Sequence, residues 1–247
     1  MALYASIDQG NTATKLTVWR DGEPVARLVS RTPGNVAMQH ALTAHGPLDG
    51  AIYCSVRPRN EVHWQMLRDV CGDSALELTH STPLPIELHY DTPQTLGLDR
   101  IAAASGAVAV FPGRECIVAD IGTAITYDSV GPDAAFHGGN IAPGAGMRLR
   151  AMHAYTAALP KVDVDGPVPP RGTDTVTAMR CGALMGIVAE LAWYRDRLPA
   201  DGLLVLTGGR AATIAPLLPF DAVVDTDLVG RGLISILQYN LQPTTTE

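Results

Sequence analysis

The sequence predicts an α/β fold made of two similar halves, each a mixed β-sheet with flanking helices. The first observation is a repeat: three segments of alternating apolar and polar residues open the chain, and three such segments return near its middle. The second is that helical and strand patterns alternate after each trio, which gives a duplicated order β-β-β-α-β-α-β-α. The repeated segments lie at residues 2–8, 13–20, 24–31, 116–121, 124–130 and 134–140.

Turn residues separate the strands and support an antiparallel meander in each trio. Asp21-Gly22 divides the second and third segments of the first trio, and Gly131-Pro132-Asp133 does the same in the second. The other expected elements are a helix near 35–46, strand 50–55, a helix near 59–71, strand 75–79, a helix at 101–111, helices near 145–158 and 174–198, strand 202–207, a helix near 209–217, strand 221–225 and a helix at 228–240.

A break between the halves is expected where Pro112-Gly113-Arg114 separates a helix from a strand. This position predicts one domain at 1–114 and a second at 115–247. The 174–198 helix of the second domain is strongly amphipathic, and Thr173 or Asp174 can cap its start. Small residues narrow one of its faces, which suits either ordinary packing inside the chain or a subunit contact.

Composition points to a small-molecule partner. The 247 residues carry a net charge of −7, and the arginines are scattered singly, so we expect no nucleic-acid and no membrane partner. The four cysteines form no C-x-x-C pair and have no histidine at metal-ligand spacing, which predicts reduced thiols and a cytoplasmic protein. The chain contains no run of 18 uncharged apolar residues, the usual sign of a membrane span.

Two turns carry residues suited to phosphate. In each, an apolar strand ends in an aspartate, Asp8 or Asp120, and glycine and hydroxyl residues follow at once. Backbone N–H groups and a hydroxyl in such a turn can donate to phosphate oxygens, while the carboxylate can hold a metal. Lys15, one of only two lysines, can add a positive charge. Two plain hairpins are the alternative; the P-loop and dinucleotide-binding glycine patterns are absent from the sequence.

A third candidate feature is the pair Asp99 and Arg100, at the expected start of an apolar helix. An acidic residue in a first helical turn is favoured by the helix dipole and can be purely structural. Phosphoryl transfer, however, needs a carboxylate that accepts the proton of the attacking hydroxyl and a cation that holds the acceptor. The pair fits both requirements, so Asp99 is the candidate base.

Six motifs, taken in order, carry a family resemblance. They are Asp8-x-Gly10-Asn11-Thr12-x-x-Lys15, Gly97-x-Asp99-Arg100, Asp120-x-Gly122-Thr123-Ala124-x-Thr126, Gly138-Gly139-x-Ile141-x-Pro143-Gly144, Thr207-Gly208-Gly209 and Asp227-Leu228-x-x-x-Gly232-Leu233. Together they span nearly the whole chain and resemble the type III pantothenate kinases, of the acetate and sugar kinase, Hsp70 and actin superfamily. The resemblance implies two actin-like (RNase H-like) halves and ATP-dependent phosphorylation of pantothenate to 4'-phosphopantothenate, the first step of coenzyme A biosynthesis.

The resemblance also implies residue roles. Mg²⁺ would lie near Asp8, a monovalent cation (K⁺ or NH₄⁺) would bind Asp120, and Asp99 would accept the proton of the pantothenate hydroxyl. Thr175 would reach pantothenate across a homodimer interface. The implied ATP-binding residues are Asp8, Gln9, Gly10, Asn11, Thr12, Ala13, Thr14, Lys15 and Thr123, and the implied pantothenate-binding residues are Tyr90, Gly97, Leu98, Asp99, Arg100 and Thr175.

Two positions depart from the family pattern without removing a charged catalytic group. Thr92 precedes Pro93 where the family often has asparagine, and Arg57 stands where a less basic residue is usual. His137 and His153 are interpreted as lone structural histidines and receive no role.

Two other functions remain compatible with the residues. One is a kinase of the same fold that acts on another small acceptor. The other is an accessory or regulatory protein that only binds nucleotide. Asp99 argues against the second, because nucleotide binding alone requires no proton acceptor.

Overall fold

The computed structural model describes residues 2–30 and 36–242, and these divide into two compact units. Unit 1 comprises 1–113, 130–137 and 227–247, and unit 2 comprises 114–129 and 138–226. Along the sequence, the first passage from unit 1 to unit 2 lies between residues 113 and 114, next to the expected boundary after residue 114. Residues 130–137 and the C-terminal helix, however, group with unit 1, although the sequence placed them in the second domain.

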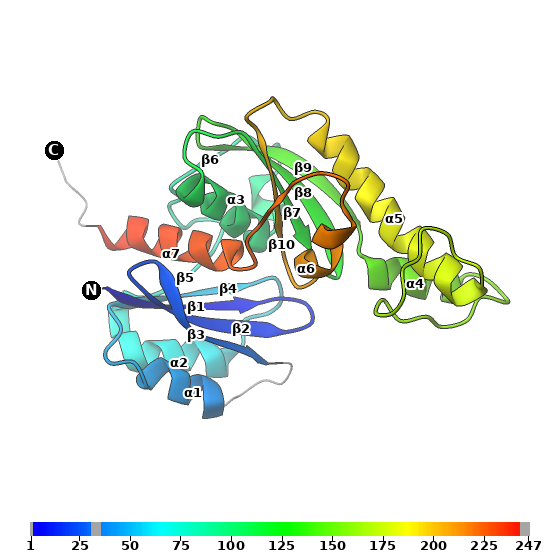
Figure 1. Ribbon diagram of the computed structural model, residues 1–247. Helices are drawn as coiled ribbons and strands as arrows, with labels where there is room; N and C mark the ends of the chain where they lie inside the picture. Colours follow the sequence, from blue (N-terminus) through cyan, green and yellow to red (C-terminus); the bar gives the residue numbers. More distant parts are fainter. Residues whose placement is uncertain (1, 31–35, 243–247) are drawn as a thin grey trace. The chain divides into compact units, whose positions relative to one another are not determined.

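The first sheet lies in unit 1 and has the strand order β3-β2-β1-β4-β5. β1 pairs antiparallel with β2 and parallel with β4, so the opening trio is the expected meander. Helices α1 and α2 cover one face of this sheet (Figure 1). The elements are β1 (Leu3–Gln9), β2 (Thr14–Arg20), β3 (Glu23–Ser30), α1 (Val36–Thr43), β4 (Gly50–Ser55), α2 (Glu61–Cys71), a 3₁₀ turn (Gly72–Ser74) and β5 (Ala75–Glu77).

The second sheet repeats this strand order. It reads β11-β10-β7-β8-β9-β6, so β9-β8-β7-β10-β11 matches the order of the first sheet. β6 was not predicted, because it is a two-residue strand in a proline-rich segment; it pairs parallel with β9. The elements are β6 (Glu87–Leu88), β7 (Cys116–Ile121), β8 (Ala124–Val130), β9 (Ala135–Pro143), α4 (Ala145–Ala154), α5 (Thr175–Arg195), β10 (Leu203–Thr207), α6 (Ala211–Ile214) and β11 (Val223–Val224), with 3₁₀ turns at Pro93–Thr95 and Ala215–Leu217.

Two helices of unit 1, α3 (Leu98–Val110) and α7 (Leu228–Leu241), pack at close range. A side chain at Gly232 would collide with the carbonyl oxygen of Ala102, and one at Gly106 would collide with the carbonyl of Leu228. Close helix packing inside the chain therefore occurs here. Helix α5 carries the face of small residues for which the sequence allows close packing, and Gly182 belongs to this face; a Cβ added at Gly182 meets no atom within 4 Å.

The α3–α7 contact predicts a large stability effect. Gly232→Leu should lower the free energy of unfolding by about 1–3 kcal/mol or more, because the new side chain must displace the backbone of α3. Urea unfolding measures the change, and Gln238→Ala, on the exposed side of the same helix, is the matched control. Equal midpoints for the two variants would contradict the close packing.

Helix α5 contributes the main core of unit 2 through Leu184, Ile187 and Leu191, which pack with residues of β7 and β10. Among the described residues it is the one helix whose length and composition would allow a membrane crossing, a property that core helices of soluble proteins share. It also contains Arg180, which is buried and donates to the carbonyls of Asp163 and Pro167.

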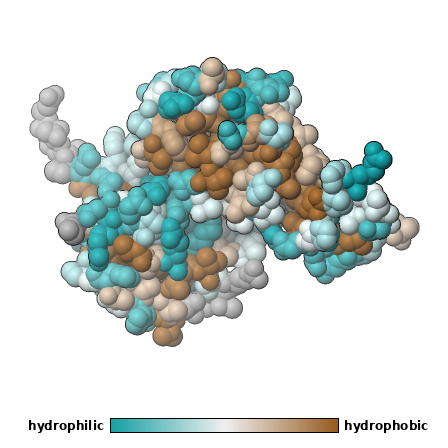
Figure 2. Space-filling view, viewed as in Figure 1, coloured by the Kyte–Doolittle hydropathy of each residue, from teal (hydrophilic) through white to brown (hydrophobic). Residues whose placement is uncertain are grey.

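Apolar surface is prominent over the region of the second sheet (Figure 2).

Candidate active site

In unit 1, the first expected phosphate turn brings two opposite charges together. Asp8 lies near the end of β1 and is the register partner of Lys15 in β2. The Lys15 Nζ lies 3.7 Å from Asp8 Oδ2, and the two side chains are 43% and 15% exposed. The ammonium is thus accessible to a ligand, while the carboxylate lies mostly beneath the surface.

The turn between these strands is closed by a backbone hydrogen bond from Gly10 N–H to the Ala13 carbonyl, at 3.0 Å. Asn11 and Thr12 are exposed at its tip, whereas Thr14 is buried. Of the expected ATP-binding residues, those at the tip can therefore offer side chains to a ligand. Thr14 can contribute only through its backbone.

The side chain of Gln9 is also engaged internally. Its amide nitrogen donates to the Pro58 carbonyl at 3.1 Å, and its amide oxygen accepts from the Tyr53 hydroxyl at 2.6 Å. That hydroxyl in turn accepts from the backbone N–H of Asn60, the N-cap of α2. Gln9 therefore anchors the end of β1 to the start of α2. Tyr53 and Asn60 are supporting residues that the sequence did not reveal, because neither belongs to a recognisable motif.

Asp99 stands in the first turn of α3, as expected. Its Oδ1 accepts the backbone N–H of Arg100 at 2.9 Å, and a side chain at Gly97 would crowd this oxygen. Burial raises the pKa of Asp99 above its ordinary value, opposed by the Arg100 hydrogen bond and charge and by Lys15. Burial likewise raises the pKa of Asp8, where Lys15 opposes the shift and the Asp99 charge adds to it. The three charged groups therefore share one electrostatic environment.

Arg100, whose contact with the acceptor stays a prediction, lies beside two aromatic rings. Its side chain is buried, and the guanidinium carbon lies 5.8 Å from the Tyr90 ring centroid and 5.4 Å from that of Phe136. The two rings meet edge to face at 5.8 Å. Arg100 therefore fixes the position of Tyr90, an expected pantothenate-binding residue, through cation–π contacts.

In unit 2, the second expected turn lies beside a glycine at which any side chain would be strained. Gly208, with φ of 86°, follows β10, and a side chain there would collide with the Asp120 carboxylate. Thr207 is the register partner of Asp120 in the neighbouring parallel strand. Its buried hydroxyl makes no hydrogen bond within the described part of the chain. A carboxylate and a hydroxyl oxygen thus lie side by side, which suits a hard cation.

The start of α4 completes this corner of unit 2. The backbone N–H of Gly144 donates to the Thr123 carbonyl at 3.1 Å, and a side chain at Gly144 would collide with the carbonyls of Gly122 and Thr123. The turn that carries Thr123 therefore lies against the N-terminal end of a helix. Such an end has free N–H groups and a partial positive charge, which favour phosphate.

Thr175 is the first residue of α5 and is exposed. Asp174 is the N-cap, accepts the Thr177 N–H at 3.0 Å and forms a reciprocal capping box with Thr177. The cap leaves the Thr175 hydroxyl without a hydrogen bond to any residue described in the structure. It is therefore available to a ligand.

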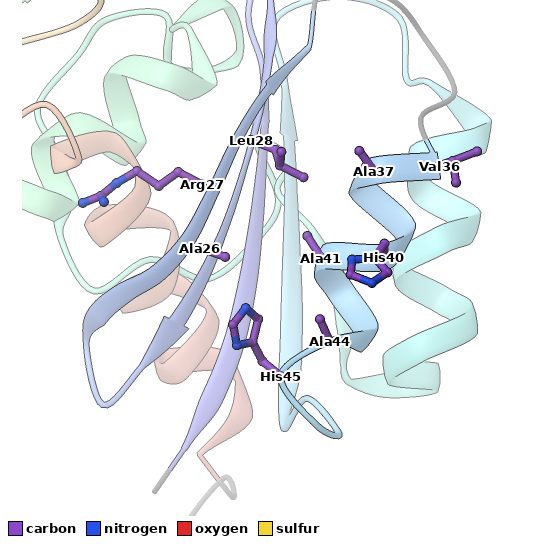
Figure 3. Close-up of a pocket in the computed structure, with 9 residues that line it drawn as sticks. All are labelled: Ala26, Arg27, Leu28, Val36, Ala37, His40, Ala41, Ala44 and His45. Carbon is purple, nitrogen blue, oxygen red and sulfur yellow. The ribbon is translucent and has the colours of Figure 1, made fainter.

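A separate hollow lies in unit 1 between β3 and α1 (Figure 3). Its walls are mainly alanine, leucine and valine, with Arg27, His40 and His45 at its edges. It includes none of the expected site residues. An apolar, carboxylate-free hollow does not suit a metal-bound triphosphate.

Comparison with known proteins identifies the family. The family model for type III pantothenate kinase matches residues 5–196. A type III pantothenate kinase of Phocaeicola vulgatus is 38% identical over 238 residues, covering 95% of this chain and 97% of the relative. The Porphyromonas gingivalis enzyme is 36% identical, with 98% and 100% covered, and that of Caulobacter vibrioides is 32% identical, with 96% and 98% covered.

Solved structures share the fold at lower identity. A Campylobacter jejuni protein assigned to the Baf family of transcriptional activators has a TM-score of 0.62 at 22% identity, with 96% of this chain and 98% of that chain covered. The 2-hydroxyisocaproyl-CoA dehydratase activator of Clostridium difficile, with bound ADPNP, has a TM-score of 0.53 at 12% identity, with 99% and 100% covered. These likenesses confirm the predicted fold class. The chain belongs to the type III pantothenate kinase family, whose enzymes use ATP to phosphorylate the alcohol group of pantothenate.

Proposed function

We propose that Asp99 is the proton acceptor in the transfer of the ATP γ-phosphoryl group to the primary hydroxyl of pantothenate. The observation that carries this role is a half-buried carboxylate, held by the Arg100 N–H at the start of a rigid helix, whose pKa burial raises. As the hydroxyl oxygen bonds to the γ-phosphorus, the bond to the bridging oxygen of ADP breaks and the hydroxyl proton passes to Asp99. A raised pKa makes the carboxylate a better base.

The 8–15 turn is proposed to bind ATP phosphates through its backbone N–H groups and the exposed Lys15 ammonium. Asp8 fits a role as magnesium ligand. Its carboxylate is mostly buried, burial raises its pKa, and a cation beside it would stabilise the ionised form. Mg²⁺ bound there would neutralise negative charge on the transferred phosphoryl group. Asp8 itself would also keep Lys15 oriented.

Asp120 is proposed to hold the monovalent cation, K⁺ or NH₄⁺. The donor set supports this role: the carboxylate lies beside the buried Thr207 hydroxyl, which otherwise makes no hydrogen bond to a described residue, and the lack of a side chain at Gly208 leaves room for this carboxylate. A cation at this point would screen phosphate charge. Thr123, beside the start of α4, would contact ATP.

We also propose that the protein is a cytoplasmic homodimer joined through α5. The outward face of this helix carries the exposed residues Ala178, Gly182, Ala189 and Trp193; Trp193 is 50% exposed, and a Cβ added at Gly182 meets no atom within 4 Å. Such a face suits a second helix at close range. Thr175, at the end of the same helix, would then contact pantothenate bound to the partner.

Substrate choice is tested with an acceptor screen. Purified protein, ATP and Mg²⁺ are combined with pantothenate or with other small alcohols and carboxylates, with and without K⁺. We expect turnover with pantothenate, and ADP release coupled to product formation. Turnover with a different acceptor alone would contradict the proposal.

The shared pocket predicts a selective effect of Thr175→Ala. Loss of one hydrogen bond to the acceptor should raise the KM for pantothenate about 10-fold, since such a bond contributes about 1–2 kcal/mol, while the KM for ATP stays nearly constant. Steady-state kinetics with each substrate varied in turn measures the difference. Equal changes in both constants would argue against a pantothenate contact.

A mixing experiment tests whether the contact crosses the dimer. In a heterodimer of an Asp99→Asn chain and a Thr175→Ala chain, one pocket would carry both changes and the other neither. Activity at low pantothenate should therefore rise after subunit exchange.

A separate variant tests the dimer contact itself. The single substitution Gly182→Arg should shift the protein from dimer toward monomer in sedimentation. Demonstrated heterodimers without recovery, or a monomeric wild-type protein, would exclude the shared pocket.

A further inference from the structure

Two histidines far apart in the sequence come together in unit 1 at the edge of the second sheet. Glu87 and Leu88 of β6 pair in parallel with Ala135 and Phe136 of β9, and the N–H of His89 continues the ladder to the Phe136 carbonyl at 2.8 Å. His89 therefore lies beside His137. The ring centroids are 4.9 Å apart, and the two Nδ1 atoms are 3.3 Å apart.

The outer nitrogen of each ring faces a carboxylate. His137 Nε2 lies 3.1 Å from both carboxylate oxygens of Asp133, and His89 Nε2 lies 3.3 Å from Glu87 Oε2. An ionised carboxylate only accepts hydrogen bonds, so each imidazole donates from Nε2. When neither Nδ1 carries a proton, the two lone pairs face each other, and a cation between them relieves the repulsion.

The distance between the rings matches a metal pair. Zn²⁺ binds imidazole nitrogen at about 2.0–2.1 Å in a tetrahedron, whose ligand-to-ligand edge is then roughly 3.3–3.4 Å. The observed 3.3 Å between the Nδ1 atoms agrees with this edge. A metal-bound histidine also usually donates its other N–H to a carboxylate, which orients the ring and raises its basicity. Both histidines have such a partner.

The backbone holds the cluster in place. The β8–β9 turn is closed by hydrogen bonds from the Gly131 N–H to the Ala135 carbonyl and from the Ala134 N–H to the Gly131 carbonyl, and the Asp133 carboxylate also accepts the Ala135 N–H at 3.3 Å. A side chain at Gly131 would collide with Asp133 and approach the His137 ring. Side-chain atoms of His89, Asp133 and His137 lie within 4.8 Å of one another, so the three residues form one compact cluster.

We propose that His89 and His137 bind one Zn²⁺ through their Nδ1 atoms, with Glu87 and Asp133 as the carboxylates that orient the rings. Solvent completes the coordination, because all four side chains are accessible. The ion would connect β6 to β9 next to Tyr90 and Phe136, the rings that contact Arg100. This proposal is independent of the catalytic roles assigned above.

Binding is measured on untagged, metal-free protein by competition with a chromophoric zinc chelator, in excess Mg²⁺ so that carboxylate sites remain occupied. We expect one zinc per chain. His89→Ala and His137→Ala should abolish binding, and Asp133→Asn should weaken it about 10- to 100-fold. His153→Ala is the control, since its ring bonds the Leu159 carbonyl elsewhere in the fold.

A second measurement does not depend on the chelator. Zn²⁺ should raise the thermal unfolding midpoint of the wild-type protein and the His153→Ala variant but not that of His89→Ala or His137→Ala, because only a ligand that binds the folded state stabilises it. Wild-type protein that binds no zinc, or histidine variants that bind as wild type does, would overturn the proposal.

Discussion

Asp99→Asn should lower kcat by about 10²–10⁴-fold while ATP still binds. The amide has nearly the same shape as the carboxylate and can still accept the Arg100 N–H, so the start of α3 should remain folded. It cannot, however, take up the proton of the attacking hydroxyl. Steady-state kinetics measures the loss of kcat. An unchanged ATP affinity in calorimetry and an unchanged thermal unfolding midpoint would show that the substitution affects only the chemical step.

The same variant tests the electrostatics of Asp99 through the pH profile. The base must be deprotonated, so the kcat/KM of the wild type should fall as the pH drops through the pKa of Asp99. Burial raises that pKa above its ordinary value of 3.8, so the acidic limb should lie at higher pH than for an exposed aspartate. Asp99→Asn should lose the part of this limb that Asp99 causes, while any part caused by Asp8, whose pKa burial also raises, should remain.

Asp99→Glu provides a matched control, because it keeps the charge but moves the carboxylate. It should retain more activity than the amide variant. Near-normal turnover by Asp99→Asn would show that another group accepts the proton or that none is needed.

Asp120→Ala should remove most activity together with the response to potassium. Without this carboxylate, the oxygen set beside Thr207 loses its negative charge and should no longer hold a cation against the phosphates. Rates are measured over a range of K⁺ concentrations, with Na⁺ added to keep the ionic strength constant. A specific effect of K⁺ is then distinguished from a general effect of salt. We expect activation of the wild type by K⁺ and a flat, low response from the variant.

Thr207→Val refines this test, since it removes only the buried hydroxyl and keeps the volume. It should weaken K⁺ activation and leave the pH profile unchanged. Equal wild-type rates in K⁺, in Na⁺ and without an added monovalent ion would contradict a cation site at Asp120.

Local patterns predicted most of the secondary structure. Alternation and turn residues predicted both meanders, and the 50–55 strand coincides with β4. Helix 145–158 was too long, because α4 ends at Ala154, and strand 221–225 is reduced to Val223–Val224. Such ends depend on packing more than on local preference. The two-residue β6 had no pattern of its own, since it forms only by pairing with β9.

The sequence by itself predicted the duplicated fold, the family and which aspartates belong to the site. Each of these predictions comes from motifs or strand and helix patterns whose residues lie close together in the chain. Only the tertiary structure decided what distant residues do to one another. It engages the Gln9 side chain with Tyr53 and buries Arg100 against two rings. It also turns His137, interpreted from the sequence as a lone histidine, into one of a facing pair with His89. The physical reason is that strand pairing and helix packing bring these side chains together, and no local spacing in the sequence records which strands and helices will meet.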